Sequence, residues 1–307
     1  EVKLAAIRDA KAVTLMDYLS FSRAQLLDFA KKPQLIDAMA NLPVYLRNYR
    51  YDREVSVDQI ELIRKELRLC WEEDFGQRYQ EITGENDLDI EEKFSLLSEW
   101  SIVIQQAYIS SNSNSLGSKI ELLKPKSELL FAPPYDLMHE DLHPMIRNFA
   151  EEFGYQDVYL VDSESGDVAY SMMKRIDFGT SLIDGPFAES HLGKLFSLAN
   201  TEVTPGEFFI ADFEPYEPSF EKPTAFMATP IFEENRKLGV LIFEFPVDKF
   251  KNVMSDRSGL GQTGETYLVG GDQLFRSDSY LNPTNFSMEV SFQDFEEVET
   301  AQVLAGL

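Results

Sequence analysis

The chain has 307 residues and a formal net charge of −25. Its hydrophobic content of 44% is enough for a sizeable core, and its length allows two domains or one domain with a large helical extension. The negative charge excludes nucleic acid and anionic membrane surfaces as partners, because both would repel it. The single cysteine, Cys70, excludes an intramolecular disulfide and a cysteine-based metal site. No stretch is apolar over the roughly 20 residues that a membrane-spanning helix needs.

The first segment predicts one long amphipathic helix from Val2 to about Lys32. Its apolar residues recur at steps of three and four, and Pro33 ends the pattern. A helix of about thirty residues extends about 45 Å, so we expect it to lie along a partner helix or the flank of a domain. Because the sequence begins inside this helical pattern, we expect it to be a fragment of a longer protein.

Shorter helices are predicted next. Ser56 followed by Gln59 forms a capping-box pattern for a helix that runs to about Gly76. Asp89, with two glutamates behind it, is a strong start for another helix that extends to Tyr108. A run of serine and asparagine then breaks the regular structure, and an irregular connection follows.

From residue 144 onward the pattern is dominated by strands. We expect Pro144 to open a helix that leads into a β-hairpin, with Gly166 supplying the positive φ that the tight turn needs. The elements form an α+β arrangement with antiparallel strands and helices gathered on one face. The predicted strands are Asp157–Asp162, Asp167–Ser171, Glu207–Asp212, Thr224–Ile231 and Leu238–Phe245, and the predicted helices are Ala188–Ala199 and Val247–Ser255.

The same order of elements then begins again. We expect strands at Glu265–Gly270, Leu274–Ser277 and Phe286–Phe292, followed by a helix from Asp294. The glycines at 259–264 precede a strand and follow a helix, which is the reverse of the dinucleotide-binding order, so we interpret them as a hinge. The predicted division is 1–130 for the helical region, 131–258 for a first α+β module and 259–307 for the incomplete start of a second, smaller one.

Residues 139–143, HEDLH, match the H-E-x-x-H signature of zinc hydrolases, in which two histidines one helical turn apart bind zinc. Pro144 opposes this interpretation, because the residue before a proline is disfavoured in a helix. We therefore expect His143 to cap or pack a helix, and we predict no metal and no other cofactor. The acid at the spacing of a third ligand, Glu164, falls in the predicted hairpin turn. A zinc-dependent hydrolase stays open as the alternative function, with His139, Glu140 and His143 as its residues.

A second set of residues surrounds the hairpin and the strands that follow it. An arginine can hold a carboxylate with two hydrogen bonds, an aspartate can hold an ammonium group, and tyrosines offer flat walls with a hydroxyl. This combination suits a small zwitterion or organic acid. We expect Arg175 to pair with Asp177, Asp212 or an acidic group of a ligand. The predicted ligand-binding residues are Tyr159, Tyr170, Arg175, Asp177, Asp212 and Tyr216.

Several passages of the sequence resemble a known family in their residues as well as in their hydrophobic pattern. They include HPMIRNFAEEFGYQDVYLVDSESGDVAYS, KRIDFGTSL, GPFAES, DFEPYEPSFEKPTAFMATPIF, KLGVLIFEFPVDKFKNVM and GLGQTGETYLVG. Over about residues 95–307 the chain resembles the extracytoplasmic sensor region of double Cache receptors. In bacteria these regions belong to chemotaxis transducers, sensor histidine kinases and nucleotide cyclases. The amino-acid-binding subgroup has an Arg-x-Trp-Tyr signature, whereas this chain has Arg175-Ile176-Asp177-Phe178.

The resemblance implies a PAS-like, five-stranded antiparallel sheet in the membrane-distal module and a smaller membrane-proximal module. It implies a non-enzymatic, periplasmic domain that senses a small molecule and is tethered to the membrane by flanking segments. We expect that molecule to be anionic or zwitterionic. The resemblance also implies a parallel homodimer through the N-terminal helix in the intact receptor. For the isolated fragment we expect a monomer or weak dimer, because the negative charges repel and the tether is missing.

Overall fold

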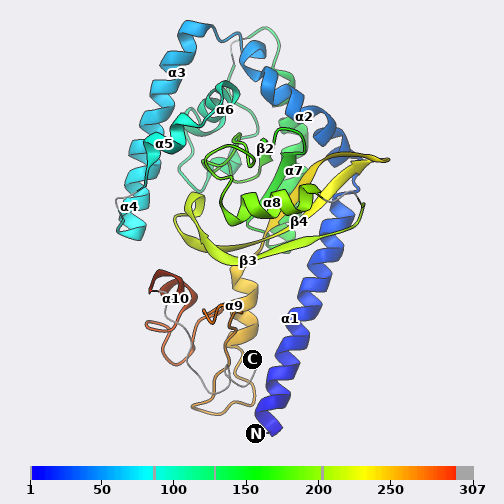
Figure 1. The fold of residues 1–307 in the computed structure, drawn as a ribbon, viewed down its shortest axis with the longest axis vertical. Coiled ribbons are helices and arrows are strands. Elements are labelled where there is room, and N and C mark those ends of the chain that lie inside the picture. The colour runs from blue at the N-terminus through cyan, green and yellow to red at the C-terminus, as the bar shows by residue number, and fades with distance from the viewer. Residues whose placement is uncertain (1, 86–87, 128, 202–203, 295–307) are drawn as a thin grey trace.

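The computed structural model describes residues 2–85, 88–127, 129–201 and 204–294. Its centre is a five-stranded antiparallel sheet in the order β2-β1-β5-β4-β3, which confirms the predicted α+β class. The sheet and most helices form a wide body, and α1, α9 and α10 extend from it to one end of the molecule (Figure 1). The strands are β1 (Asp157–Asp162), β2 (Val168–Ser171), β3 (Phe209–Tyr216), β4 (Lys222–Glu233) and β5 (Arg236–Glu244).

The predicted hairpin of β1 and β2 is confirmed. Leu160 pairs with Tyr170, and Gly166 in the connecting turn has φ +71°, a backbone conformation that glycine adopts without a steric penalty. The hairpin continues into the sheet through β5, which pairs with β1 along its whole length. This pairing places the start of β1 beside the end of β5, so Asp157 lies opposite Glu244.

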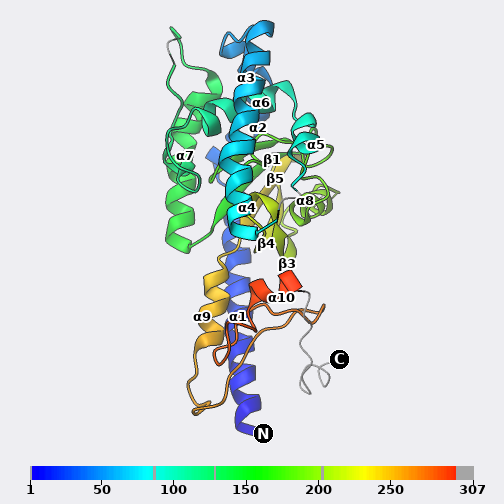
Figure 2. The ribbon, with the colours of Figure 1, turned by 90° about the vertical axis from the view of Figure 1, so that its left-hand side faces the viewer.

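Helices cover both faces of the sheet, which corrects the prediction that they gather on one face. Every residue of β1 is buried, and alternate side chains belong to two cores on opposite sides. Val158 and Leu160 pack with α2 and α7, whereas Tyr159 and Val161 pack with α8. Figure 2 shows α7 and α8 on the two sides of the sheet. These helices are α2 (Pro33–Asp52), α7 (Pro134–Phe153) and α8 (His191–Thr201).

The long N-terminal helix is confirmed as α1 (Val2–Phe29), and Pro33 begins α2 after a short break. Below the sheet α1 packs along α9 (Val247–Ser255), where the rings of Tyr18 and Phe250 meet edge to face at 5.8 Å. Helix α1 therefore lies along a flank of its own chain. Within the described ranges, no helix has the length and the apolar character that crossing a membrane requires.

The helical region is more broken than predicted. The capping box of Ser56 and Gln59 is confirmed, but the helix continues past Gly76 through a π-helical turn. Asp89 caps a helix as predicted, yet Ser98 caps a new one, so the single helix expected up to Tyr108 is two. The elements are α3 (Val57–Leu69), the π-turn Cys70–Gly76, α4 (Gln77–Thr83), α5 (Ile90–Ser95), α6 (Glu99–Gln105) and the π-turn Gln106–Ser110.

Pro144 lies inside α7 rather than at its start, which corrects the prediction for both the helix and His143. Helix α7 begins at Pro134, so His139 and His143 lie one turn apart on it, with their rings stacked at 4.7 Å. A proline inside a helix removes one backbone hydrogen bond, and the local preference against it was the basis of the prediction. Burial of both histidines, with Leu142 and Ile146, outweighs that cost.

The second module differs most from its prediction. In place of two full strands, the structure has a single bridge between Val269 and Phe275. The segment expected as the strand Phe286–Phe292 contains α10 (Met288–Asp294). The helix predicted from Asp294 onward extends outside the described residues. The division at 130 and 258 stays a prediction, although α2, α6 and the sheet share one core.

Gly239 in β5 is the point where α2 comes closest to the sheet. A Cβ atom built there would collide with the Met39 side chain and with the carbonyl oxygen of Val161. We predict that Gly239→Ala lowers the free energy of unfolding by about 1–3 kcal/mol, because both neighbours lie in a packed core. Chemical denaturation of both proteins measures this. Gly271→Ala is the control, since its Cβ would meet no atom within 4 Å, and an equal cost in both variants would contradict the prediction.

Candidate ligand-binding cleft

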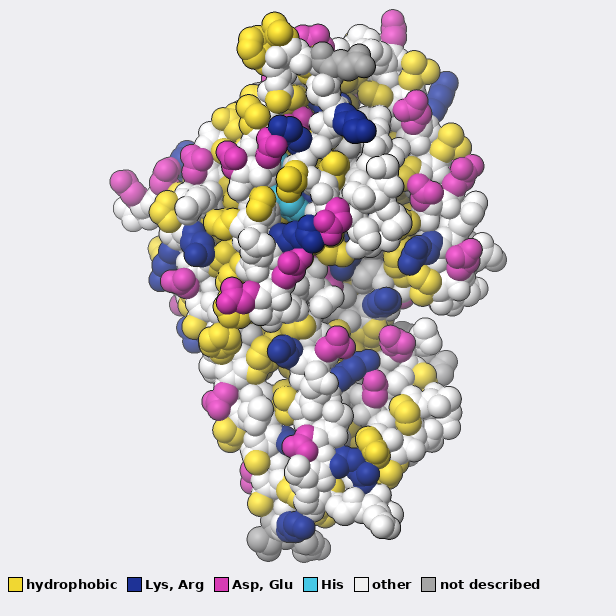
Figure 3. Space-filling model, turned by 180° about the vertical axis from the view of Figure 1, so that it is seen from behind, with side chains coloured by type: hydrophobic (Ala, Val, Ile, Leu, Met, Phe, Trp, Pro, Cys, Tyr) yellow, Lys and Arg dark blue, Asp and Glu magenta, His cyan; other side chains and the backbone are white. Residues whose placement is uncertain are grey.

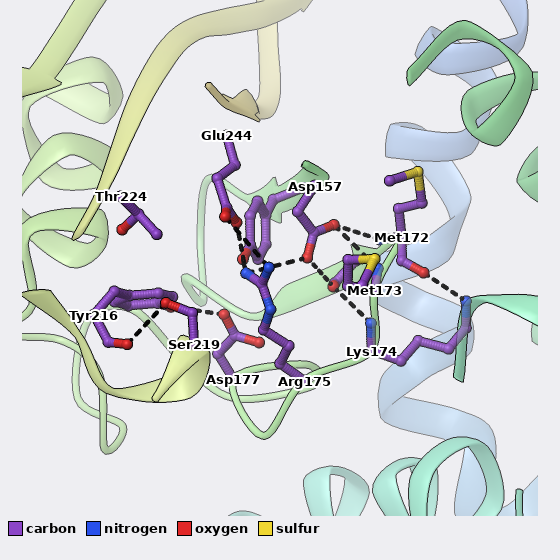
Figure 4. Close-up of polar contacts among 12 residues, drawn as sticks. Asp157, Met172, Met173, Lys174, Arg175, Asp177, Tyr216, Ser219, Thr224 and Glu244 are labelled. Carbon is purple, nitrogen blue, oxygen red and sulfur yellow. Dashed lines mark hydrogen bonds and ion pairs between the residues drawn. The ribbon is translucent and has the colours of Figure 1, made fainter. Parts of the chain in front are cut away.

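Arg175 is the centre of a buried charge cluster at one end of the sheet. Its guanidinium lies between the carboxylates of Glu244 and Asp157 (Figure 4). Nη1 lies 2.5 Å from Glu244 Oε2 and 3.9 Å from Asp157 Oδ2, and Nη2 lies 3.3 Å from Glu244 Oε1. The predicted partners of Arg175 were Asp177 and Asp212, so the partner is corrected to Glu244. Lys174, at φ +54°, reverses the chain after β2 and its own side chain extends away from Arg175.

Four of the six predicted residues meet in this cluster. Tyr216 donates its hydroxyl hydrogen to Asp177 Oδ2 at 2.6 Å, and Arg175 Nη1 donates to the Tyr159 hydroxyl at 3.4 Å. Tyr159, Asp177 and Tyr216 are almost completely buried. Asp177 Oδ1 is buried and has no hydrogen-bond partner among the described atoms. The structure thus brings together residues from β1, β3 and the loop after β2.

The other two predicted residues lie elsewhere. Tyr170 faces the opposite side of the sheet, where its hydroxyl lies 2.7 Å from Nδ1 of His143. Asp212 has a side chain that is 57% exposed, and it pairs with Arg276 of the second module at 2.9 Å. Tyr170 pairs with Leu160, the neighbour of Tyr159, so alternation turns it to the other face, whereas Asp212 lies in the irregular stretch of β3 between Ala211 and Glu214. Neither residue contributes to the Arg175 cluster.

Sequence reasoning missed Asp157 and Glu244. A signal was present, because each is an acid at the end of a strand whose central residues are apolar and buried on both faces. A charge in such a strand needs a partner of opposite sign. Which partner it finds depends on the antiparallel pairing of β1 with β5, and sequence order alone does not reveal that pairing.

Negative charge exceeds positive charge in the cluster, since Asp157, Asp177 and Glu244 share one guanidinium. Burial raises the pKa of Asp157 to about 7, although Arg175 opposes the shift. Burial also raises the pKa of Asp177. For Arg175, burial alone would lower the pKa, but Glu244 and its neighbours raise it well above the ordinary value. The guanidinium therefore stays charged, whereas burial favours the protonated forms of Asp157 and Asp177.

A cleft of about 420 Å³ opens above Arg175 and Glu244. At the right edge of Figure 3 the surface is hollowed between the upper body and the narrower lower part, on the side where α4 and α10 lie in Figure 1. Residues of the sheet, of the helical region and of the second module all line the cleft. Its polar and charged lining includes Arg78, Arg175, Ser219, Lys222, Thr224, Glu244, Asp248, Lys251 and Glu289.

The histidine pair on α7 has helical spacing, and one nitrogen of each ring lies against a backbone carbonyl oxygen. His139 Nδ1 lies 2.6 Å from the carbonyl oxygen of Leu123, and His143 Nε2 lies 2.7 Å from that of Ile120. Both rings thus fasten the connection before α7. Glu140 forms an ion pair with Lys124 at 2.6 Å. Among the residues that the structure describes, no group of three His, Cys, Asp or Glu side chains is placed to hold a metal ion.

No protein-family model matches the sequence, and a search of curated proteins finds no match. Solved structures do match. The ligand-binding domain of the Pseudomonas fluorescens chemoreceptor CtaA, in complex with L-serine, is 16% identical with a TM-score of 0.30, over 45% of this chain and 54% of that domain. The chain therefore spans about half of the CtaA domain.

Two further structures match over more of their length. The sensor domain of the V. cholerae histidine kinase DctB is 14% identical with a TM-score of 0.36, over 74% of this chain and 76% of that one. The sensory domain of the Campylobacter jejuni chemoreceptor Tlp3 is 13% identical with a TM-score of 0.35, over 79% of each chain. All three are sensor, sensory or ligand-binding domains.

We predict that Arg175→Met lowers the free energy of unfolding by roughly 3–5 kcal/mol at pH 8, because it leaves buried carboxylates without their cation. The cost should shrink at pH 5, because Asp157, whose pKa burial raises to about 7, takes up a proton above that pH. Urea denaturation at both pH values measures the effect. Arg236→Met is the control, because the Arg236 side chain is 67% exposed in its ion pair with Glu233. Similar costs for the two variants would contradict the prediction.

His191 gives a pH-dependent prediction. Its Nε2 lies 3.1 Å from the carbonyl oxygen of Thr224, and burial lowers its pKa to about 4. As the pH falls below about 6.5, His191 binds a proton in the unfolded chain but stays neutral in the folded chain. The free energy of unfolding therefore decreases. We expect the stability advantage of wild type over His191→Gln to fall by roughly 2 kcal/mol between pH 7 and pH 5. Parallel stability curves in denaturant titrations would show that His191 does not titrate in this way.

Proposed function

We propose that this chain is the sensing module of a membrane-anchored bacterial receptor and that it binds a small molecule in the cleft above Arg175 and Glu244. The observation that carries the proposal is a preformed cleft of about 420 Å³ whose floor is a buried, hydrogen-bonded ion pair. Concave sites with a few fixed polar groups are the usual places where proteins hold small ligands. The resemblance of the sequence to double Cache receptors supports the same reading.

The module is proposed to lie in the periplasm, tethered by segments that flank the present sequence. The N-terminal end of α1 and the second module lie at the same end of the molecule, which suits attachment to one membrane (Figure 1). We further propose that the intact receptor is a parallel homodimer through α1. One side of α1 packs on α9, whereas several large apolar side chains on α1 are half exposed or more. These are Leu4, Val13, Met16 and Phe21.

The lining of the cleft favours a zwitterionic ligand. Arg175 is already neutralised by Glu244, and Lys251 pairs with Asp278. A ligand that is only an anion would therefore find no spare charge at Arg175. Further lining charges of both signs have no ion pair among the described residues, and they can hold the two ends of a zwitterion. These are Arg78 and Lys222 from α4 and β4, and Asp248 and Glu289 from α9 and α10.

The domain is proposed to be non-enzymatic, with any catalytic output in another part of the receptor. In the Arg175 cluster the carboxylates bind a guanidinium and tyrosine hydroxyls, which is an arrangement for holding charge. The zinc hydrolase alternative requires two ligating histidines and a free general base. In the structure both histidines hydrogen-bond to backbone carbonyl groups and Glu140 pairs with Lys124, so this function is disfavoured.

We predict that a thermal-shift screen of amino acids, betaines, amines and organic acids identifies a zwitterion that stabilises the wild-type protein. Lys222→Met and Asp248→Asn should each weaken its binding about tenfold or more, because each removes one charge-assisted contact. Both side chains are exposed, so the melting temperature without ligand should change little. Calorimetric titration of the same hit measures the affinities.

Lys249→Met is the matched control, since Lys249 is on α9 beside Asp248 but does not line the cleft. Its affinity should equal that of wild type. A hit that binds the three variants equally well would place the ligand elsewhere. A screen that yields only simple anions would contradict the zwitterion.

A further inference from the structure

The turn between β3 and β4 adopts an unusual backbone conformation. Phe220 and Glu221 follow each other with φ +60° and +57°. Left-handed conformations are uncommon for residues with a Cβ atom, because that atom approaches the neighbouring carbonyl oxygen. Two such residues in succession, neither of them glycine or asparagine, are strained, and strain of this kind persists only where surrounding contacts hold it.

The helical region supplies the contacts that hold this turn. Tyr79 of α4 donates its hydroxyl hydrogen to Glu221 Oε1 at 2.9 Å. Lys93 of α5 pairs with Glu217 at 2.9 Å. The ring of Phe75 stacks on the ring of Phe220, with centroids 5.1 Å apart and planes inclined by 23°. Three side chains from outside the sheet thus contact one five-residue turn, residues 217–221.

Two residues of this turn, Glu217 and Glu221, are partly buried acids. Burial raises the pKa of Glu217 and of Glu221, and the two carboxylates repel each other. Glu217 Oε1 is buried without a hydrogen-bond partner among the described atoms. The turn therefore combines backbone strain with mutual repulsion of its side chains, and both favour its release from the helical region.

The same turn forms a wall of the cleft. Ser219 and Phe220 line the cleft together with Lys222 and Thr224, which follow directly in β4. Phe220 also lines a smaller cavity of about 60 Å³, to which Phe75 contributes. Movement of the turn away from Phe75 and Tyr79 would join these two spaces.

We propose that residues 217–221 are a strained strap that the helical region holds against the cleft. When the hydrogen bond from Tyr79 to Glu221 breaks, the strap moves and this wall of the cleft opens. This inference rests on the cleft being the ligand site, and it deepens that proposal by naming the segment that regulates access. Helices α3 to α5 then act as the holder of the strap, so a ligand that moves Phe220 alters the contact between the sheet and the helical region.

Amide hydrogen exchange tests the strap without any ligand. The Phe220 amide donates to the Glu217 carbonyl at 2.8 Å, and the Glu221 amide donates to the Tyr216 carbonyl at 3.1 Å. In Tyr79→Phe we expect both amides to exchange roughly tenfold faster than in wild type, as the loss of one hydrogen bond to a carboxylate implies. In Tyr79→Phe with Glu221→Asn, protection should return toward the wild-type value, because asparagine tolerates the left-handed conformation.

Two internal controls accompany this experiment. Tyr51→Phe removes a hydroxyl from an exposed tyrosine and should leave both amides unchanged. Glu234, at φ +54° in the β4–β5 turn, is also left-handed and should not respond to Tyr79→Phe. Unchanged exchange in Tyr79→Phe, or equal exchange in the single and double variants, would overturn the strap. The amide exchange rates are measured without ligand, so failure of the ligand screen would not change them. The two proposals can therefore be contradicted independently.

Discussion

The ion pair of Arg175 with Glu244 is the interaction on which this end of the sheet depends. Asp157 begins β1, Glu244 ends β5, and Arg175 and Asp177 come from the loop after β2. Three parts of the chain that are distant in sequence must therefore meet before any of these charges is compensated. Because a buried carboxylate without a partner is costly, the cluster fixes the register of β1 against β5 and the path of the loop together. The cleft above them has a rigid floor as a result.

The cleft is bounded by three parts of the molecule. The sheet provides its floor, α4 and the β3–β4 turn provide one wall, and α9 with α10 provides another. A ligand bound in the proposed site would contact all three, and it would favour the arrangement for which its affinity is highest. Helix α9 also packs along α1, where Lys11 donates to the carbonyl oxygen of Met254 at 2.8 Å. Helix α9, which forms one wall of the cleft, thus contacts the long helix directly.

Local signals in the sequence predicted local structure well. The hairpin turn at Gly166, the caps at Ser56 and Asp89, and the bounds of α9 follow from residues within a few positions of each other. The start of α7 was predicted wrongly because Pro144 is unfavourable locally, whereas burial of the histidine face is a tertiary effect. Periodicity also missed the second covered face of the sheet, since a strand apolar on both faces shows no alternation.

The candidate site was predicted in part for the same reason. Residue type and position near strand ends identified Tyr159, Arg175, Asp177 and Tyr216, which do meet. The ion-pair partner Glu244 lies 69 residues further along the chain, at the end of β5, and only the strand order places it beside Arg175.

Strand β3 forms one edge of the sheet, and edges are where sheets of separate molecules join and aggregate. Pro215 blunts one part of it, since proline offers no amide hydrogen to an incoming strand. Arg276 of the second module covers another part by holding Asp212. Excision of the first module at residue 258 would uncover this edge and leave Asp212 without its cation. In a protein shortened in that way, we expect more of β3 to be open to pairing with a strand of another molecule.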